Sequence, residues 1–344
     1  MSQETSTWLN TRTLIGFTAQ RGHAWHYRAD QQGNEPNHYP GPVPVEDVQR
    51  RLFDWDAVTA GVFAEYYNPD GFVRLTDPAR KAIVRPAGAF GPDDAGAILG
   101  LFKDGYLIHQ FREWLLGTVG SILDDGDLSI GSAGLLKGGA VAWVSVEVPD
   151  TITTPEGVAF RPNLLACTSH DGSLATTFQR VVTNVVCDNT MSAALAESGQ
   201  RVKVRHSRYS KMRLGEARQA LAVVHTIADD FAAQVAELAA TTVTDRQWAK
   251  FLDAHCTTSA SSSRARTMAA RKWDTLSGLW EHDLRVAPWR GTAWGVIQAV
   301  NTYTHHEQTV RGADRAERNM LRAVDGGTDT LDTTTLTTLR RVLA

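Results

Sequence analysis

The chain has 344 residues, with 35 Lys and Arg against 38 Asp and Glu and a formal net charge of −3. This balance excludes a histone-like or polybasic protein, and 42% hydrophobic against 21% charged residues places the chain in the globular class. The sequence contains no run of the roughly 18 apolar residues that a membrane span needs, and its start lacks the pattern of a secretory signal. We therefore expect a cytoplasmic protein of about two structural units, with no membrane partner.

The cysteines are few and irregularly placed. Cys167, Cys187 and Cys256 are an odd number and form no Cys-x-x-Cys pair. This pattern disfavours both a disulfide framework and a thiolate zinc site, so we expect reduced thiols and neither a metal nor a cofactor.

The N-terminal third of the chain predicts an irregular arm followed by short regular elements. Residues 1–44 mix Gly, Asn, His and Pro, which favours an arm without regular structure. A short helix is expected over 45–53, and apolar residues spaced by three and four predict a helix over 107–123. Strand-forming patches lie between these helices, at 57–67, 81–85 and 97–102.

The middle of the chain predicts an antiparallel meander. Strands are expected at 128–136 and 140–148, on either side of a Lys-Gly-Gly turn, and at 160–168 and 174–182, on either side of an Asp-Gly turn. Together with the packed helices they predict an α+β core domain over 45–210.

The last third, 211–344, is expected to be largely helical. Apolar residues between Ala217 and Leu238 alternate steps of four and three, which is the pattern of a heptad seam. The polar stretch 256–263 is the best candidate for a linker. The remaining helices are expected at 245–254, 264–282, 292–306, 315–324 and 333–343.

The densest charge feature is a run of cations that follows the meander. The run has no acidic residue before Glu216, and its members are Arg201, Lys203, Arg205, Arg208, Lys211 and Arg213. If the segment is extended, alternation places the first three on one face and the intervening valines on the other. Such a stripe beside Tyr209 would attract phosphates and stack an unpaired base. The alternative is an edge strand whose charges prevent aggregation.

Two polar residues precede this run at a strand-to-helix junction. Asn189 and Thr190 begin a helix expected over 189–197, where they would cap the free amides of the first turn. The same amides could hold a phosphate. A second cluster of cations and tryptophans lies between Arg264 and Trp280, where core packing is the default for the tryptophans.

No catalytic constellation is recognisable. A hydrolase could use Cys187 with His170, or a metal, but sequence separation does not establish such an arrangement. The glycine-rich segment 131–138 lacks the Lys-Ser/Thr ending of a P-loop, so nucleotide hydrolysis is not expected. We assign no catalytic residue.

Several short motifs resemble one known family. They are Ala24-Trp25-His26, Leu52–Trp55, Gly131–Gly139, Ser169–Ser173, Arg180–Thr190, Arg205-His206 and Gly291–Gly295 with Asn301 and Tyr303. The chain resembles a phage/plasmid-like family of unknown function found in actinobacterial phages and mobile elements, although Tyr27-Arg28 departs from its usual Gly-Leu-Gly. The resemblance implies a setting of laterally moving DNA and no particular activity. The meander followed by a helix and cations is also more distantly similar to single-strand annealing recombinases.

These features lead to one expected function and two alternatives. We expect an ATP-independent protein that binds and anneals single-stranded DNA in phage or mobile-element recombination or replication. It would act as a homo-oligomer, with other phage recombination or replication proteins as further partners. The first alternative is a non-catalytic accessory protein that binds a host or phage protein through its helical half. The second is the hydrolase using Cys187 and His170 or a metal.

Overall fold

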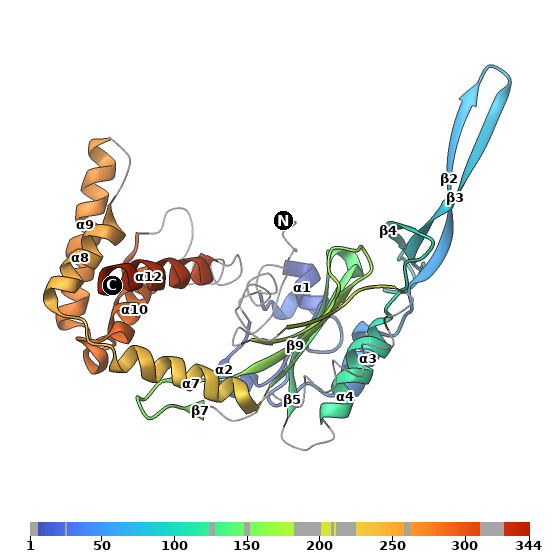
Figure 1. Ribbon diagram of the computed structural model, residues 1–344. Helices are drawn as coiled ribbons and strands as arrows, with labels where there is room; N and C mark the ends of the chain where they lie inside the picture. Colours follow the sequence, from blue (N-terminus) through green and yellow to red (C-terminus); the bar gives the residue numbers. More distant parts are fainter. Residues whose placement is uncertain are drawn as a thin grey trace. The chain divides into compact units, whose positions relative to one another are not determined.

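A computed structural model of the chain describes residues 6–24, 26–123, 128–147, 152–181, 201–207, 210, 225–257, 262–309 and 327–344. The fold is α+β, with antiparallel sheets and a helical C-terminal part, as the sequence predicts (Figure 1). Contacts divide the chain into two compact units. Unit 1 is Met1–Thr151 with Arg161–Ile227, and unit 2 is Ile152–Phe160 with Ala228–Ala344.

Unit 1 is built on a six-stranded sheet in which all neighbours are antiparallel. The strand order is β1-β5-β6-β9-β10-β11. The strands are β1 (Thr13–Ile15), β5 (Ser129–Leu136), β6 (Val141–Glu147), β9 (Asn163–Ser169), β10 (Thr176–Val181) and β11 (Arg201–Val204). The two expected hairpins are therefore confirmed, and β9 follows β6 in the sheet as a meander requires.

One face of this sheet forms the core of unit 1. Leu14, Ala133, Val144, Ala166 and Phe178 lie in one row of the strand register and are all buried. Burying this apolar row supplies the main driving force for folding. Three helical segments contribute side chains to the same core, and they are α3 (Val45–Leu52), η2 (Arg112–Leu116) and α4 (Gly117–Leu123).

A close approach of an aromatic ring to backbone fixes the opposite face. Trp143 lies across from Gly134 in the register of β5 and β6, and it is fully buried. A Cβ atom at Gly134 would stand 2.0 Å from the indole ring. Only glycine leaves room for this ring to approach the neighbouring strand so closely.

The helix expected over 107–123 starts later than its apolar pattern indicates. Its first turn, η2, is a wide π-helical turn, and residues 107–110 are not helical. The difference has a physical reason at Gln110, whose side chain donates to the carbonyl oxygen of Ala57 at 2.8 Å and accepts from its amide at 3.0 Å. This tertiary pairing holds the preceding segment extended.

The N-terminal arm has more regular structure than its composition predicts. It contains α1 (Ser6–Arg12), β1, α2 (Thr18–Arg21) and η1 (Ala29–Gln31), and β1 joins the large sheet as an edge strand. The correction arises because β1 pairs with β5, a strand more than a hundred residues later, through Thr13 opposite Gly134. Local composition carries no information about that pairing.

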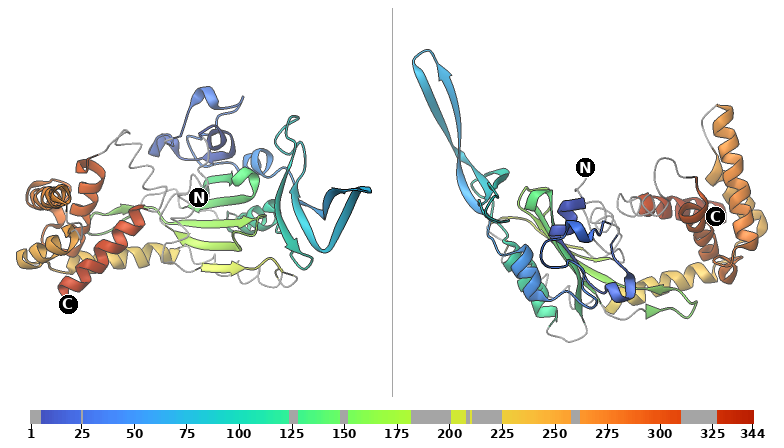
Figure 2. Two further views of the ribbon diagram at one scale, coloured as in Figure 1. Left: turned by 90° about the horizontal axis from the view of Figure 1, so that it is seen from above. Right: turned by 180° about the vertical axis from the view of Figure 1, so that it is seen from behind.

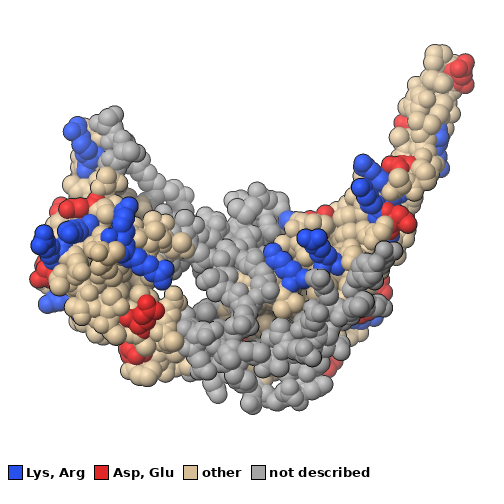
Figure 3. All heavy atoms as spheres, in the orientation of Figure 1, with Lys and Arg blue, Asp and Glu red and all other residues tan. Residues whose placement is uncertain are grey.

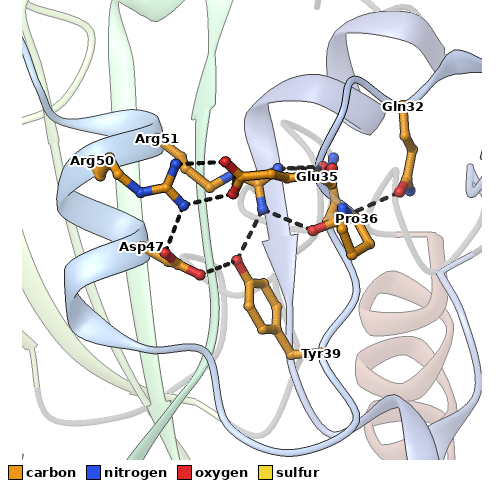
Figure 4. A network of polar contacts seen from close by, with 8 residues as sticks. Gln32, Glu35, Pro36, Tyr39, Asp47, Arg50 and Arg51 are labelled. Atoms are coloured by element: carbon orange, nitrogen blue, oxygen red, sulfur yellow. Dashed lines mark hydrogen bonds and ion pairs between the residues drawn. The ribbon is translucent and has the colours of Figure 1, made fainter.

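A polar network fastens the arm to α3 (Figure 4). The Arg50 guanidinium donates to both carboxylate oxygens of Glu35, at 2.7 and 2.6 Å, and to Asp47 at 2.8 Å. Tyr39 donates its hydroxyl to Asp47 at 2.7 Å, and Arg51 donates to the same hydroxyl at 2.9 Å. Hydrogen bonds from Arg50 lower the pKa of both Glu35 and Asp47. The network holds residues 35–39 against α3, through Asp47 in its first turn and Arg50 and Arg51 in its last.

Unit 1 also carries a smaller three-stranded sheet, β2-β3-β4. Its strands are β2 (Val58–Asn68), β3 (Gly71–Arg85) and β4 (Ala97–Lys103). The expected strand at 81–85 is thus the end of a much longer one. The missed part, Gly71 to Arg80, contains Pro78 and a register shift opposite Gly61 and Val62, which break the strand pattern.

Unit 2 is helical around a core of its own. Its elements are β7 (Ile152–Thr153), β8 (Ala159–Phe160), α7 (His225–Ala240), α8 (Asp245–Cys256), α9 (Ser263–His282), η4 (Ala287–Trp289), α10 (Ala293–Thr302), η5 (Tyr303–Glu307) and α12 (Gly327–Leu343). Capping explains where these helices begin. Thr244 and Gln247 form a reciprocal capping box at α8, and Thr292 accepts from the amide of Gly295 at 3.1 Å. Figure 2 shows these helices from two further sides.

Some expected elements fall outside the described residues. These are the helices at 189–197 and 315–324 and the first part of the heptad helix, which is described from His225 as α7. The expected linker spans the end of α8 and the Ser262 cap of α9, with 258–261 outside the description. Within the described ranges, no helix is both long and apolar enough to cross a bilayer.

Candidate functional site

The candidate site is the edge strand β11. It pairs with β10 in the register Thr177 to Lys203 and Phe178 to Val202, and it is the last strand in the order of the large sheet. In this register Val202 continues the apolar row of the core. The sheet therefore fixes which side chains of β11 turn inward.

Side chains alternate along β11 as the sequence predicts. Val204 is fully buried and Val202 packs against the core, whereas Lys203 and the following Arg205 are exposed. The side chain of Arg201 lies outside the described residues. One exposed cation thus lies in the edge strand and the second directly follows it, two residues or about 7 Å further along an extended chain.

Several cations of unit 1 pair with carboxylates, whereas Lys203 and Arg205 have no such partner among the described residues. Elsewhere in unit 1 Arg74 pairs with Glu65 at 2.5 Å, and Lys137 pairs with Asp171 at 3.8 Å. In the part of the chain that the structure describes, neither Lys203 nor Arg205 forms an ion pair with a carboxylate.

The end of β11 is anchored by His206, which enters a column of stacked rings. Tyr106 stacks on His206 at a centroid distance of 4.9 Å, and His206 stacks on His109 at 3.9 Å. The column continues to Trp114 below His109 at 3.6 Å and to Phe102 above Tyr106 at 3.9 Å. It runs from half-buried Phe102 into the fully buried core. Stacking of this extent holds the exposed strand on a rigid base.

Two threonines link the histidines through hydrogen bonds. Thr176 lies 2.6 Å from His109 Nδ1 and 2.7 Å from the hydroxyl of Thr168, which lies 3.2 Å from His206 Nε2. His206 Nδ1 donates to the carbonyl oxygen of Leu107, so the neutral ring accepts at Nε2 and the hydroxyls point toward it. Since Thr168 donates to His206 and Thr176 donates to Thr168, His109 Nδ1 donates to the hydroxyl oxygen of Thr176.

Burial keeps these histidines neutral. Desolvation lowers the pKa of His206 to about 4 and that of His109 to about 2, where the neighbouring histidines add to the effect. Neutral rings stack closely without charge repulsion. The cluster is therefore a support for β11 at neutral pH rather than a set of charged groups.

A comparison with family models places the chain. One model, a domain of unknown function (DUF932), matches residues 98–325, about two thirds of the chain. The chain belongs to the DUF932 family. Searches of the curated proteins and of the solved structures find no match.

The DUF932 match includes β11 and the column of rings from Phe102 to His206, and it begins after β2 and β3. The motif-based expectation of a family of unknown function is thereby confirmed. The family description carries no activity, so the site of this DUF932 protein has to be judged on its geometry.

The other residues expected at the site lie outside the described residues. They are Asn189, Thr190, Arg208, Tyr209, Lys211 and Arg213. Their role in phosphate or base binding stays a prediction. Cys187 also lies outside the description, whereas Cys167 and Cys256 are buried and are not joined in a disulfide.

The histidine suggested for a hydrolase sits in the core of the DUF932 protein. His170 is only 1% exposed, donates through Nε2 to the carbonyl oxygen of His109 at 3.1 Å, and stacks on Phe111 at 3.9 Å. Burial lowers its pKa to about 4. Among the described residues, no group of three His, Cys, Asp or Glu is placed to hold a metal.

Lys and Arg also gather over α8 and α9 in unit 2 (Figure 3). Arg264 and Arg266 are exposed there, whereas Lys272 donates to the carbonyl oxygen of His255 at 3.3 Å. Trp280 is buried and stacks on Trp248 at 4.5 Å, so it belongs to the core of unit 2, as the default reading of the sequence has it. This cluster therefore supplies exposed cations, but the ring of Trp280 is not exposed for stacking on a base.

Sequence reasoning missed the column of rings and its threonines. Its members come from segments as far apart as Phe102 and His206, and the only local signal was the Arg205-His206 pair quoted for the family resemblance. A histidine directly after an amphipathic edge strand, with the strand's valines turned inward, is the pattern that could have located it.

Proposed function

We propose that this protein binds single-stranded DNA along β11 and anneals complementary strands without ATP. The setting would be recombination or replication of a phage or mobile element, in the cytoplasm of the host. In this proposal the phosphates of the DNA are bound by Arg201, Lys203, Arg205, Arg208, Lys211 and Arg213. Tyr209 stacks on a base, and Asn189 and Thr190 assist in binding phosphate at the start of a helix.

One observation carries this proposal. Lys203 in the edge strand β11 and Arg205 directly after the strand are both exposed, and neither pairs with a carboxylate in the described part of the chain. Their spacing of about 7 Å is comparable to that between neighbouring phosphates of an extended single strand. When single-stranded DNA binds to such cations, the counterions condensed on its phosphates are released, which favours binding.

The buried support of β11 favours binding as well. Val202 and Val204 pack into the core and His206 is stacked between Tyr106 and His109, so the backbone of β11 does not have to be ordered when a ligand arrives. A preorganised site loses less entropy on binding than a flexible one.

Oligomerisation follows from the charge balance. The protein carries a net charge of −3 and concentrates its cations locally, so one copy holds a strand weakly. When several copies align on one DNA strand, the effective concentration of each copy's β11 rises, and so does the overall affinity for the DNA. Further phage recombination or replication proteins would act on the resulting complex.

Salt-dependent binding tests the proposal. We expect a labelled oligothymidylate to bind at low salt by fluorescence anisotropy, with an affinity that falls steeply as salt increases. Replacing Lys203 and Arg205 together by alanine should flatten the slope of log affinity against log salt by about 1.4, since each phosphate contact on a single strand contributes about 0.7. Duplex DNA should bind more weakly, because it offers no unpaired bases to Tyr209.

The matched control removes the same charge from another surface. Arg246 and Lys250 are exposed one turn apart on α8 and form no ion pair within the described residues. The Arg246→Ala, Lys250→Ala variant should keep the slope of the unmodified protein. Absence of binding at low salt would refute the proposal, as would equal slopes for the two double variants.

A further inference from the structure

The β2–β3 hairpin carries most of the exposed large hydrophobic side chains among the described residues. Only its base is flanked by a third strand, because β4 pairs with Arg80–Arg85 and no further along β3. Beyond that point two strands run on alone (Figure 1). Phe63 and Phe72 are 51% and 52% exposed, and Tyr67 is 82% exposed. A two-stranded ribbon of this kind is only marginally stable in water, so a covering partner is expected.

The free edge of the hairpin is β2. It lies at the end of the strand order β2-β3-β4, so one side of its eleven residues pairs with nothing in the described chain. Natural edge strands are usually blunted by lysine, proline or bulges. β2 has none of these and carries one charge, Glu65. An edge of this composition is a template for another strand.

The features that block pairing lie on the other strand. Beyond β4, the outer edge of β3 carries Arg74, Asp77 and Pro78, and the three residues between Asp77 and Lys81 are the extra ones at the register shift. Addition of a strand is therefore open at β2 and blocked at β3. When two copies pair through β2, the pairing uses the β2 edge of both copies, so this contact closes after one step.

We propose that β2 pairs antiparallel with β2 of a second copy of this chain, which joins the two hairpins into one four-stranded sheet. Full overlap of the eleven residues puts Phe63, the central residue, opposite itself on the two-fold axis. In that register Glu65 faces Gly61, so the single carboxylate of each copy meets no like charge.

Side-chain size is complementary in the same register. The first half of β2 is small, with Thr59, Ala60 and Gly61, and the second half is large, with Tyr66 and Tyr67. Antiparallel overlap sets Ala60 against Tyr66 and Thr59 against Tyr67. Aromatic side chains that cover small residues on the facing strand are a favourable cross-strand arrangement.

This surface stands apart from the proposed binding of single-stranded DNA. The hairpin precedes the DUF932 match, and β11 is not part of its sheet. Self-association without nucleic acid tests the hairpin alone, whereas the salt series tests β11 alone. The two proposals can therefore fail independently, and the two experiments show which of them has failed.

Opposite charges at the two-fold axis provide the test. Phe63→Lys places two lysines face to face, and Phe63→Glu places two carboxylates there. We expect each variant to dissociate in sedimentation velocity, with the dissociation constant of the dimer raised at least ~10-fold. Mixing the two variants should restore a dimer, because lysine then faces glutamate. The unmodified chain should sediment as a dimer.

Phe72→Lys is the matched control. Phe72 has the same side chain and nearly the same exposure as Phe63, but it lies on β3, away from the free edge. It should leave the dimer intact. An equal loss in this variant would show that the aromatic face binds rather than the edge, and it would overturn the proposed pairing. A monomeric unmodified chain would overturn it too, as would stacking of the hairpin on DNA bases as the only association found.

Engineered cysteines test the register. Directly opposed residues of antiparallel strands have Cα atoms about 4.5–5.5 Å apart, within disulfide range. Phe63→Cys should therefore crosslink with itself on mild oxidation. Tyr67→Cys should not, because it faces Thr59 of the other copy, and it should crosslink to a Thr59→Cys chain. Efficient crosslinking of Tyr67→Cys with itself would contradict the register.

Discussion

The buried histidines of unit 1 should make the protein sensitive to acid, and His170 allows the size of the effect to be worked out. Its pKa is about 4 in the folded chain, against an ordinary value of 6.5, because burial disfavours the charged ring. Above pH 6.5 both states are neutral at this residue. Below it the unfolded chain takes up a proton that the folded chain does not, so stability is lost as the pH falls from about 6.5 to about 4.

The expected loss from this one residue is about 2 kcal/mol between pH 7.5 and pH 5, since each unit of pKa difference corresponds to 1.36 kcal/mol. Replacing His170 by phenylalanine removes the titration. The new ring keeps the stack on Phe111 and loses the hydrogen bond to the carbonyl oxygen of His109, a cost that does not depend on pH. The pKa values of His109 and His206, about 2 and about 4, keep these rings largely neutral in both folded proteins down to pH 5, so their contributions nearly cancel in the comparison.

Hydrogen exchange measured by mass spectrometry reports the stability of unit 1 separately. Peptides that cover β6 and β9 should be compared between the unmodified protein and His170→Phe at each pH, so that intrinsic exchange rates cancel. The protection of the unmodified protein relative to the variant should fall about 30-fold from pH 7.5 to pH 5. A ratio that stays constant across this range would refute the assignment of a depressed pKa to His170.

Two further predictions concern packing and capping. Gly134→Ala should destabilise unit 1 by about 2 kcal/mol, because the new methyl group would overlap the Trp143 ring, whereas Gly278→Ala in the exposed interior of α9 should stabilise unit 2 by about 1 kcal/mol. If both substitutions shifted the thermal unfolding temperature in the same direction, this reasoning would be contradicted. Thr244→Ala should cost about 1 kcal/mol by breaking the capping box with Gln247, and an unchanged melting temperature would show that the cap does not stabilise α8.

The sequence predicted those parts of the fold whose signals are local. The β5–β6 hairpin follows from its Lys-Gly-Gly turn, and the alternation correctly predicted that Lys203 and Arg205 are exposed while Val204 is buried. The helices of unit 2 begin at Thr244 and Ser262, which are ordinary capping residues.

The missed features depend on residues that are distant in sequence. β1 is a strand only because it pairs with β5, and the first half of β3 is a strand although Pro78 interrupts its pattern. The ring column joins Tyr106 to His206, which are a hundred residues apart. Tertiary pairing overrode local propensity at each of these places.

The small β7–β8 hairpin affects how the protein can be dissected and synthesised. Residues Ile152–Phe160 lie between two strands of the large sheet in sequence, yet they belong to unit 2, where Trp289 donates its indole N–H to the carbonyl oxygen of Glu156 at 3.0 Å. No single cut therefore separates the two units. A fragment that ends at Ile227 retains the hairpin without its helices, and the remaining fragment lacks the acceptor for Trp289. During synthesis, β7 and β8 leave the ribosome well before the helices of unit 2. The hairpin therefore cannot pack against these helices until the last third of the chain has been made.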